Sequence, residues 1–440
     1  MSFGGIFCKN RDKTKELRIN QLENYKRMKI KNYIKSVFTL SLTVVMFWMF
    51  SLIGCGGPDK IKALVVTGQN NHNWSLSSKN LKTILETTSL FDVEMAVSPE
   101  GGGDMTAFHP AFAKYQVVVL DYNGEAWPEE TQRDFEKYMK NGGGLVVYHA
   151  ANNPFPEWKA FNEMIGVGGW GDRDEQDGPY VYWEKDKFVR DTSPGKAGSH
   201  GEAHPYKVTI RNQEHPVTKG LPVQWMHAKD ELYNHLRGPA QNMDILATAY
   251  DDTTYNGSGH DEPVLMAIQY GKGRVFHTIL GHAGNDTDVF PAMQCVGFIV
   301  TLQRGAEWAA TGKVTQTIPA DFPNSVSVHK WENFVPMILE ELMDRVVVYK
   351  VGKSRKYLAD LSNRIRMSDG SEATLAEFEK SMIDMLQSDA TIDSKKYICK
   401  ELSWMGSEHS IPILKSLLED GEMSDMAAYA LHRLDPSALK

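Results

Sequence analysis

Residues 142–151 read Gly-Gly-Gly-Leu-Val-Val-Tyr-His-Ala-Ala. The short apolar run inside this stretch, over Gly144–His149, is typical of a parallel strand that is buried on both faces. Three similar runs come earlier in the chain: Ile61–Thr67, Phe91–Val97 and Tyr115–Asp121. Helical patterns lie between them, with one helix expected to begin at Ser75 or Ser77 and another over Pro128–Met139. Because strands and helices alternate, the sequence predicts an α/β fold with a doubly wound, mostly parallel sheet.

The pattern becomes less regular after this stretch. Loops rich in glycine, aspartate and tryptophan fill residues 166–201. Four strand-like runs then follow: Tyr206–Ile210, Asp244–Ala249, Val264–Tyr270 and Arg274–Leu280. A helix over Asp288–Gln303 is expected to close the domain. We therefore expect one α/β domain over residues 60–311.

The C-terminal part of the chain is predicted to be a small all-α segment. Met385-Leu386 recurs as Leu417-Leu418, 32 residues later (residue 418 against residue 386), and Leu402 and Leu434 repeat this offset. Such a period predicts paired-helix repeats, and residues 372–440 resemble HEAT-like repeats. Repeats of this kind usually present a surface to a partner protein; the alternative is that the helices pack on the main domain. Residues 312–371 are a linker or helical extension without an assigned role.

Residues 1–55 are expected to form an export signal that ends in a lipobox. An apolar run over Val37–Ile53 follows several lysines and leads into Gly54-Cys55. A charged segment, an apolar segment and a small residue before the cleavage point are typical of secreted precursors. Cys55 is therefore the expected lipidation site, anchoring an exported protein at the cell envelope, facing the periplasm or the surface; a single membrane-spanning anchor is the alternative. Because residues 1–27 are long and charged for such a signal, translation is expected to start at Met28.

Charge and cysteine content exclude several classes of protein. The 440-residue chain has a formal net charge of -8 and contains no stripe of Lys and Arg, so nucleic acid is not expected as a partner. Its four cysteines, Cys8, Cys55, Cys295 and Cys399, are scattered without CxxC spacing. Neither a disulfide framework nor a thiolate zinc site is predicted.

Three histidines follow predicted strands. His72 comes after Ile61–Thr67, His149 ends its strand, and His282 follows Arg274–Leu280. Ligands of open α/β sheets bind outside the carboxyl ends of the strands, so these imidazoles are expected to converge. They are candidate ligands of a divalent metal, with zinc the first choice, and His149 and His282 are also candidate catalytic residues. Without metal, the same imidazoles could serve as general acid and base.

Other side chains are candidates to complete the site. Glu231 could orient a histidine, bind a metal or take a proton; a solvated acidic pair with Asp230 is the alternative. Two strand-end residues and three aromatic residues are candidates for substrate binding, although each aromatic could instead be a packing residue: Asp121, Asn152, Trp74, Trp170 and Tyr233.

No nucleophile is found where an α/β enzyme would place one. The turn after Leu145-Val146-Val147 carries Tyr148-His149-Ala150, so neither serine nor cysteine occupies a nucleophile elbow. The glycine runs at 101–103 and 142–144 lack the context of a phosphate-binding loop. Nucleophilic acyl transfer is therefore not predicted at this turn.

Taken in order, these motifs resemble the ThuA-like (trehalose utilisation) family, a branch of the class I glutamine-amidotransferase-like fold. The resemblance covers residues 60–310 and is carried by six motifs: KALVVTG at 62–68 with His72 and Trp74, GGGLVVYHAA at 142–151, GVGGWG at 166–171, HPVTKGLP at 215–222, DELY at 230–233 and GRVFHTILGH at 273–282. It implies a flavodoxin- or amidotransferase-like fold that lacks the nucleophilic cysteine, and hence not a glutamine amidotransferase.

The resemblance also implies a role in carbohydrate metabolism. The expected function is that of a sugar-active hydrolase or lyase acting on a disaccharide or keto-glycoside. In it, His72, His149 and His282 surround a metal or proton-transfer centre and Glu231 assists. The expected ligand is a sugar or glycoside that reaches the protein at the envelope. The alternative is a non-catalytic carbohydrate-binding or scaffold protein whose helical C-terminus docks a partner enzyme.

Overall fold

The structure is a computed structural model that describes residues 60–335, 337–368 and 370–439. The predicted export signal, Met28 and Cys55 lie outside these residues. Lys60–Lys440 forms one compact unit. In the part of the chain that the structure describes, none of the helices is both long and apolar enough to cross a membrane.

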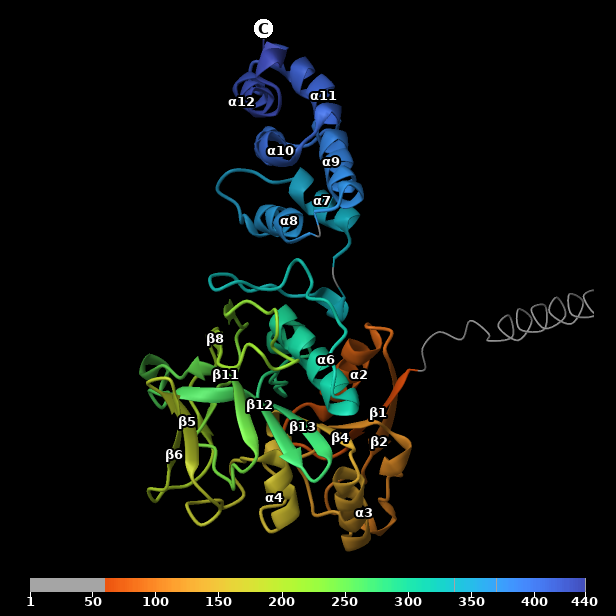
Figure 1. The fold of residues 1–440 in the computed structure, drawn as a ribbon, viewed down its shortest axis with the longest axis vertical. Helices are drawn as coiled ribbons and strands as arrows, with labels where there is room; N and C mark the ends of the chain where they lie inside the picture. Colours follow the sequence, from red (N-terminus) through yellow and green to blue (C-terminus); the bar gives the residue numbers. More distant parts are fainter. Residues whose placement is uncertain (1–59, 336, 369, 440) are drawn as a thin grey trace, which may run out of the picture. The chain divides into compact units, whose positions relative to one another are not determined.

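A mixed, mostly parallel sheet forms the centre of the α/β domain, as the alternating pattern predicted (Figure 1). Five adjacent strands are parallel. The four inner ones are mostly buried on both faces, whereas the edge strand alternates between buried and exposed residues. In sheet order they are β2 (Phe91–Val97), β1 (Ile61–Thr67), β3 (Val117–Leu120), β4 (Gly144–Tyr148) and β13 (Gly273–Thr278).

The remaining strands extend this sheet in antiparallel fashion. Strand β12 (Asp261–Tyr270) turns directly into β13, and such a tight connection forces antiparallel pairing. Beyond it lie β11 (Met243–Tyr250), β8 (Lys207–Ile210) and β9 (Gln224–Met226), while β5 (Tyr180–Glu184) pairs with β12 and with β6 (Lys187–Asp191). Parallel pairing therefore stops at β13, which is parallel to β4 on one side and antiparallel to β12 on the other.

Helices cover both faces of the parallel strands. In Figure 1, α2 (Trp74–Glu86) and α6 (Val296–Thr311) lie on one side, and α3 (Glu129–Lys140) and α4 (Lys159–Ile165) on the other. Helix α3 is amphipathic: Phe135 and Met139 are buried, whereas its charged residues are mostly exposed.

Two predicted helix boundaries are wrong. The closing helix is interrupted at Cys295, whose extended backbone separates α5 (Pro291–Gln294) from α6, and α6 continues to Thr311. Helix α2 begins at Trp74, with Asn73 as its N-cap residue, rather than after Ser75 or Ser77. Ser77 lies within the first turn, where its amide donates to the Asn73 carbonyl at 2.9 Å and its hydroxyl donates to Oδ2 of Asp121 at 2.6 Å.

The register of the sheet places several strand ends side by side. Val66 of β1 pairs with Leu120 of β3, and Tyr148 of β4 pairs with Thr278 of β13. The loops that follow β1 and β13 also meet, since the Asn73 amide donates to the Ala283 carbonyl at 2.9 Å. The residues after β1, β4 and β13 therefore share one edge of the sheet.

The C-terminal part is helical, as predicted, and has its own hydrophobic core. Leu386 and Leu402, two members of the predicted repeat, are buried in that core. Its helices are α7 (Leu339–Val347), α8 (Lys356–Met367), α9 (Glu372–Gln387), α10 (Ile392–Met405), α11 (Ile411–Ser416) and α12 (Ser424–Leu434). Helices α7 and α8, from the segment without an assigned role, contribute Leu342 and Leu361 to the core. The HEAT-like interpretation stays a prediction.

Candidate metal centre and adjoining cavity

His149 follows β4 at a sharp turn. It begins the short 3-10 helix His149–Asn152, and its φ of 47° lies in the left-handed region that residues other than glycine seldom adopt. The side chain is buried, and its Nδ1 donates to the Ile279 carbonyl at 2.6 Å. Because this bond fixes the tautomer, the lone pair is on Nε2, where the Tyr233 hydroxyl lies 2.9 Å away.

His72 is held by residues of its own loop. Oδ1 of Asn70 accepts from the His72 backbone amide at 3.1 Å and from Nδ1 of its ring at 3.2 Å. The Asn70 amide group in turn donates to Oδ1 of Asp121 at 3.1 Å. This Asp121–Asn70–His72 chain leaves Nε2 of His72 as the nitrogen available to a metal.

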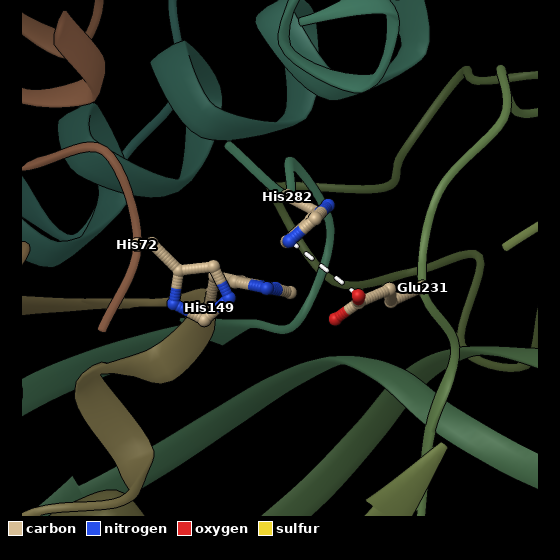
Figure 2. A group of neighbouring side chains, drawn as sticks. All are labelled: His72, His149, Glu231 and His282. Carbon is tan, nitrogen blue, oxygen red and sulfur yellow. Dashed lines mark ion pairs between the residues drawn. The ribbon is translucent and has the colours of Figure 1, made fainter. Parts of the chain in front are cut away.

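His282 and Glu231 complete the group (Figure 2). His282 follows Gly281, whose φ is 100° and whose missing Cβ would lie 2.7 Å from the Phe298 ring, so this turn requires glycine. Nε2 of His282 lies 3.4 Å from Oε1 of Glu231, the contact drawn as a dashed line in Figure 2.

These four side chains form a donor set that could hold a metal ion. One ligand atom from each of His72, His149, Glu231 and His282 lies within 4.8 Å of the others. The ring centroid of His72 lies 4.9 Å from that of His149 and 4.9 Å from that of His282. Three imidazoles and one carboxylate, with two ring tautomers already fixed by outer hydrogen bonds, are donors that suit zinc.

The electrostatic environment keeps two imidazoles neutral. Burial, together with repulsion from His282, lowers the pKa of His72 to about 4. Burial and the neighbouring His72 and His282 lower the pKa of His149 well below its ordinary value. Since a metal binds only the neutral imidazole, both rings are ready to act as ligands near neutral pH.

A polar cavity of about 490 Å³ adjoins the group. Trp170 and Tyr233 meet in its wall edge to face, with ring centroids 4.7 Å apart. The remaining lining residues are mostly polar or belong to backbone turns: Asn71, His72, Asn123, Gly124, Asn153, Pro154, Phe155, Pro156, Gly171, His200 and Glu231. Oδ1 of Asn153 is buried and has no hydrogen-bond partner among the described residues.

Three residues expected to bind substrate do not line this cavity. Asp121 is buried behind His72, where its oxygens accept from Asn70 and Ser77. The Asn152 amide contacts Nε2 of His277 at 3.1 Å in the core. Trp74 is half-buried at the start of α2. The Asp121 carboxylate and the Asn152 amide nitrogen thus contact interior side chains and not the cavity. Their role in substrate binding stays a prediction.

Sequence reasoning assigned no site role to several residues that shape the site. His200 lies in β7 (Ser199–His200), which pairs with β10 (Tyr233–Asn234), and its Nε2 is 3.9 Å from Oε2 of Glu231. A two-residue pairing is too short to leave a pattern in the sequence. Asp230 was noticed only as a neighbour of Glu231, although its carboxylate is buried.

Arg173 was missed as well. Its buried guanidinium donates to the carbonyls of Asn153, Pro154 and Gly169 at 2.6, 2.7 and 3.0 Å. These carbonyls belong to two segments of the cavity wall. A buried arginine with only carbonyl and amide partners has no sequence signature, since no acidic residue at a fixed spacing accompanies it.

Fold and site together define an α/β protein with a mixed central sheet in which a histidine stands at the sharp turn after β4. The chain belongs to the ThuA family, described as trehalose utilisation, whose family model matches residues 62–309. It is similar to the crystal structure of a ThuA-like protein from Parabacteroides merdae, with 54% identity over 63% of this chain and 100% of that chain and a TM-score of 0.62.

A ThuA-like protein from Bacteroides uniformis is also similar, with 19% identity over 60% of this chain and 96% of that chain and a TM-score of 0.39. No curated protein matches the chain.

Proposed function

We propose that this protein is a metal-dependent, sugar-active hydrolase or lyase that acts on a disaccharide or keto-glycoside. The family's association with trehalose utilisation supports a carbohydrate substrate. The observation that carries the proposal is the convergence of His72, His149, His282 and Glu231 within 4.8 Å, next to a polar cavity. Neutral imidazoles at His72 and His149 beside a polar cavity form an arrangement suited to metal-assisted chemistry.

The three histidines would hold a divalent ion, with zinc the first choice. When bound, such an ion supplies a Lewis acid and makes a water acidic near neutral pH. The protein's contribution is to keep the imidazoles of His72 and His149 neutral by burial and to orient them before the ion arrives. The Ile279 carbonyl orients His149, and Asn70 orients His72.

Glu231 is placed to move a proton. One of its oxygens faces His282 at 3.4 Å and the other faces His200 at 3.9 Å, and the residue lines the cavity. A carboxylate at this position can accept a proton from water or from a sugar hydroxyl and return it to the departing oxygen. The buried Tyr233 hydroxyl can donate a hydrogen bond to a substrate oxygen from the same side.

The cavity wall suits a neutral, hydroxyl-rich ligand. The half-buried Trp170 offers an aromatic face for the apolar side of a sugar ring. Asn71, Asn123 and Asn153 line the cavity and bring amide groups to its wall.

A turnover assay tests this function. Purified protein is incubated with candidate disaccharides and their 3-keto forms, with and without a chelator, and products are separated by chromatography. We expect turnover that the chelator abolishes and zinc restores, and that His149→Ala eliminates. Binding without turnover under every metal condition would overturn the enzymatic proposal in favour of a carbohydrate-binding protein.

We further propose that the protein acts at the cell envelope, anchored through a lipid on Cys55. This follows from the lipobox at Gly54-Cys55. Mass spectrometry of the mature protein should find an acylated N-terminal cysteine, and Cys55→Ala should release the protein from the membrane fraction. An unmodified precursor that remains in the cytoplasm would contradict the proposal.

A further inference from the structure

A buried carboxylate lies directly behind the candidate metal centre. The side chain of Asp230 has no exposed surface. Its Oδ1 accepts from the backbone amides of Glu231 and His282 at 2.9 and 3.0 Å. Its Oδ2 accepts from the Gly281 amide and from Nε2 of His227, both at 2.7 Å. Four donors from two segments of the chain, residues 227–231 and 281–282, therefore meet on one carboxylate.

The contacts of Asp230 connect two parts of the centre that no strand pairing joins directly. Glu231 and His282 belong to loops about fifty residues apart in sequence. Asp230 accepts a hydrogen bond from the backbone amide of each. Hydrogen bonds to an ionised carboxylate are about twice as strong as neutral ones, and the complete burial of the Asp230 side chain strengthens them further. The hydrogen bonds of Asp230 to the two backbones thus fix the distance of 3.4 Å between the Glu231 and His282 side chains.

We infer that Asp230 is the positioning residue that assembles the metal centre, by fixing the loops that carry Glu231 and His282. This inference rests on the metal centre of the proposed function. Asp230 does not belong to the group of four ligand atoms, so it acts through Glu231 and His282 rather than on the ion.

An asparagine at this position has nearly the same size as the aspartate but lacks one of its acceptors. An NH2 group would replace one carboxylate oxygen, and its hydrogens would point at donors from which the oxygen had accepted hydrogen bonds. At least two buried donors would lose their acceptor, and the loops would shift to satisfy them. Loss of an outer partner of this kind typically lowers metal affinity by about 10- to 100-fold.

The test compares Asp230→Asn with Glu262→Gln in the full chain. Glu262 is a second fully buried carboxylate, which accepts hydrogen bonds from Tyr180 and Ser258 and does not belong to the candidate centre. Zinc affinity is measured by competition with a chromophoric chelator, and the ligand geometry by the absorption spectrum of the Co²⁺-loaded protein. Thermal unfolding is followed with and without zinc.

We expect Asp230→Asn to bind zinc about 10- to 100-fold more weakly, with an altered Co²⁺ spectrum and a smaller zinc-induced rise in Tm. Glu262→Gln should lose stability but keep the wild-type affinity and spectrum. Wild-type affinity and spectrum in Asp230→Asn would overturn the positioning role while leaving the metal centre intact. Absence of zinc and cobalt binding by the wild-type protein would overturn the metal centre itself, and the inference with it.

Amide hydrogen exchange of the metal-free wild-type protein tests the inference without any variant. The amides of Glu231, Gly281 and His282 should exchange slowly before zinc is added, because Asp230 already holds them. Slow exchange that appears only after zinc binding would mean that the metal, and not Asp230, assembles the loops. This measurement decides the matter even if Asp230→Asn does not fold.

Discussion

The hydroxyl of Tyr233 lies 2.9 Å from Nε2 of His149, the same nitrogen that the proposed metal would use. Since Nδ1 of His149 donates to the Ile279 carbonyl, Nε2 has the free lone pair and Tyr233 donates to it. Burial, with Glu231 and Asp230 nearby, raises the pKa of Tyr233 well above its ordinary value, so its proton stays in place. Metal binding must displace this hydrogen bond.

Tyr233→Phe should therefore bind zinc more tightly than the wild-type protein. A hydrogen bond with a net worth of about 1 kcal/mol no longer has to be broken, which corresponds to about a five-fold lower Kd. Turnover should fall at the same time, because the substrate loses a donor. Chelator competition and steady-state kinetics measure the two effects.

The matched control for this prediction is Tyr206→Phe. The Tyr206 hydroxyl is also buried, but it has no hydrogen-bond partner among the described residues. Its removal should leave the zinc Kd unchanged. Weaker zinc binding by Tyr233→Phe would mean that the hydroxyl supports the ion instead of competing with it.

The stability of the metal-free protein should fall in mild acid. The folded-state pKa of His72, about 4, lies below the 6.5 of an unperturbed histidine, so the unfolded chain binds more protons between these values. Stability is fully present above pH 6.5 and is lost as the pH falls toward 4. At pH 5 the loss from His72 alone is about 2 kcal/mol, and His149 changes stability in the same direction.

Urea unfolding at several pH values measures this loss. His72→Gln should flatten the pH dependence, whereas His109→Gln, which alters a partly exposed imidazole outside the centre, should leave it as it is. A His72→Gln curve as steep as that of the wild-type protein would show that other groups control the acid sensitivity.

Arg173→Lys should loosen the cavity wall. A lysine cannot donate in the fixed fork with which Arg173 joins the carbonyls of Asn153, Pro154 and Gly169. We expect a loss of about 2 kcal/mol in the free energy of unfolding and a several-fold higher KM, with kcat largely kept. Arg133→Lys, at an exposed i,i+4 ion pair, is the control and should change neither quantity.

Trp170→Ala should weaken sugar binding without affecting the metal. The indole forms part of the cavity wall but does not belong to the four-residue group. Loss of a stacking aromatic is expected to cost about ten-fold or more in affinity, measured by calorimetry with the best substrate. Trp170→Phe should recover part of it. Equal sugar affinity in all three proteins would remove Trp170 from the binding surface.

The sequence was sufficient to predict the fold class and the meeting of the three histidines. Parallel strands end at the same edge of a sheet, so residues following β1, β4 and β13 had to lie near one another once the strands were recognised. Side-chain direction could not be predicted in the same way. Asp121 and Asn152 also follow strands, yet hydrogen bonds to Ser77, Asn70 and His277 direct them into the interior.

Other parts of the site depend on contacts that leave no pattern in the sequence. The break at Cys295 interrupts an apolar run that reads as one helix, because tertiary contacts override the local helical preference there. Asp230 and Arg173 form hydrogen bonds with backbone groups of other loops. Every residue has such backbone groups, so the sequence does not indicate which of them are the partners. Only the folded chain reveals which carbonyls and amides those two side chains meet.

Strands β1, β4 and β13 lie close together in the sheet but far apart in the sequence, so the three histidines that follow them span almost the whole length of the α/β domain. His72 stands near its beginning and His282 near its end, so a chain emerging during synthesis, or one held unfolded, never presents the three imidazoles together. Closing such long loops is slow and occurs late in folding. An ion held by all three histidines would therefore be acquired after the fold is complete, and the metals present in the compartment where folding finishes would decide which one the site takes up.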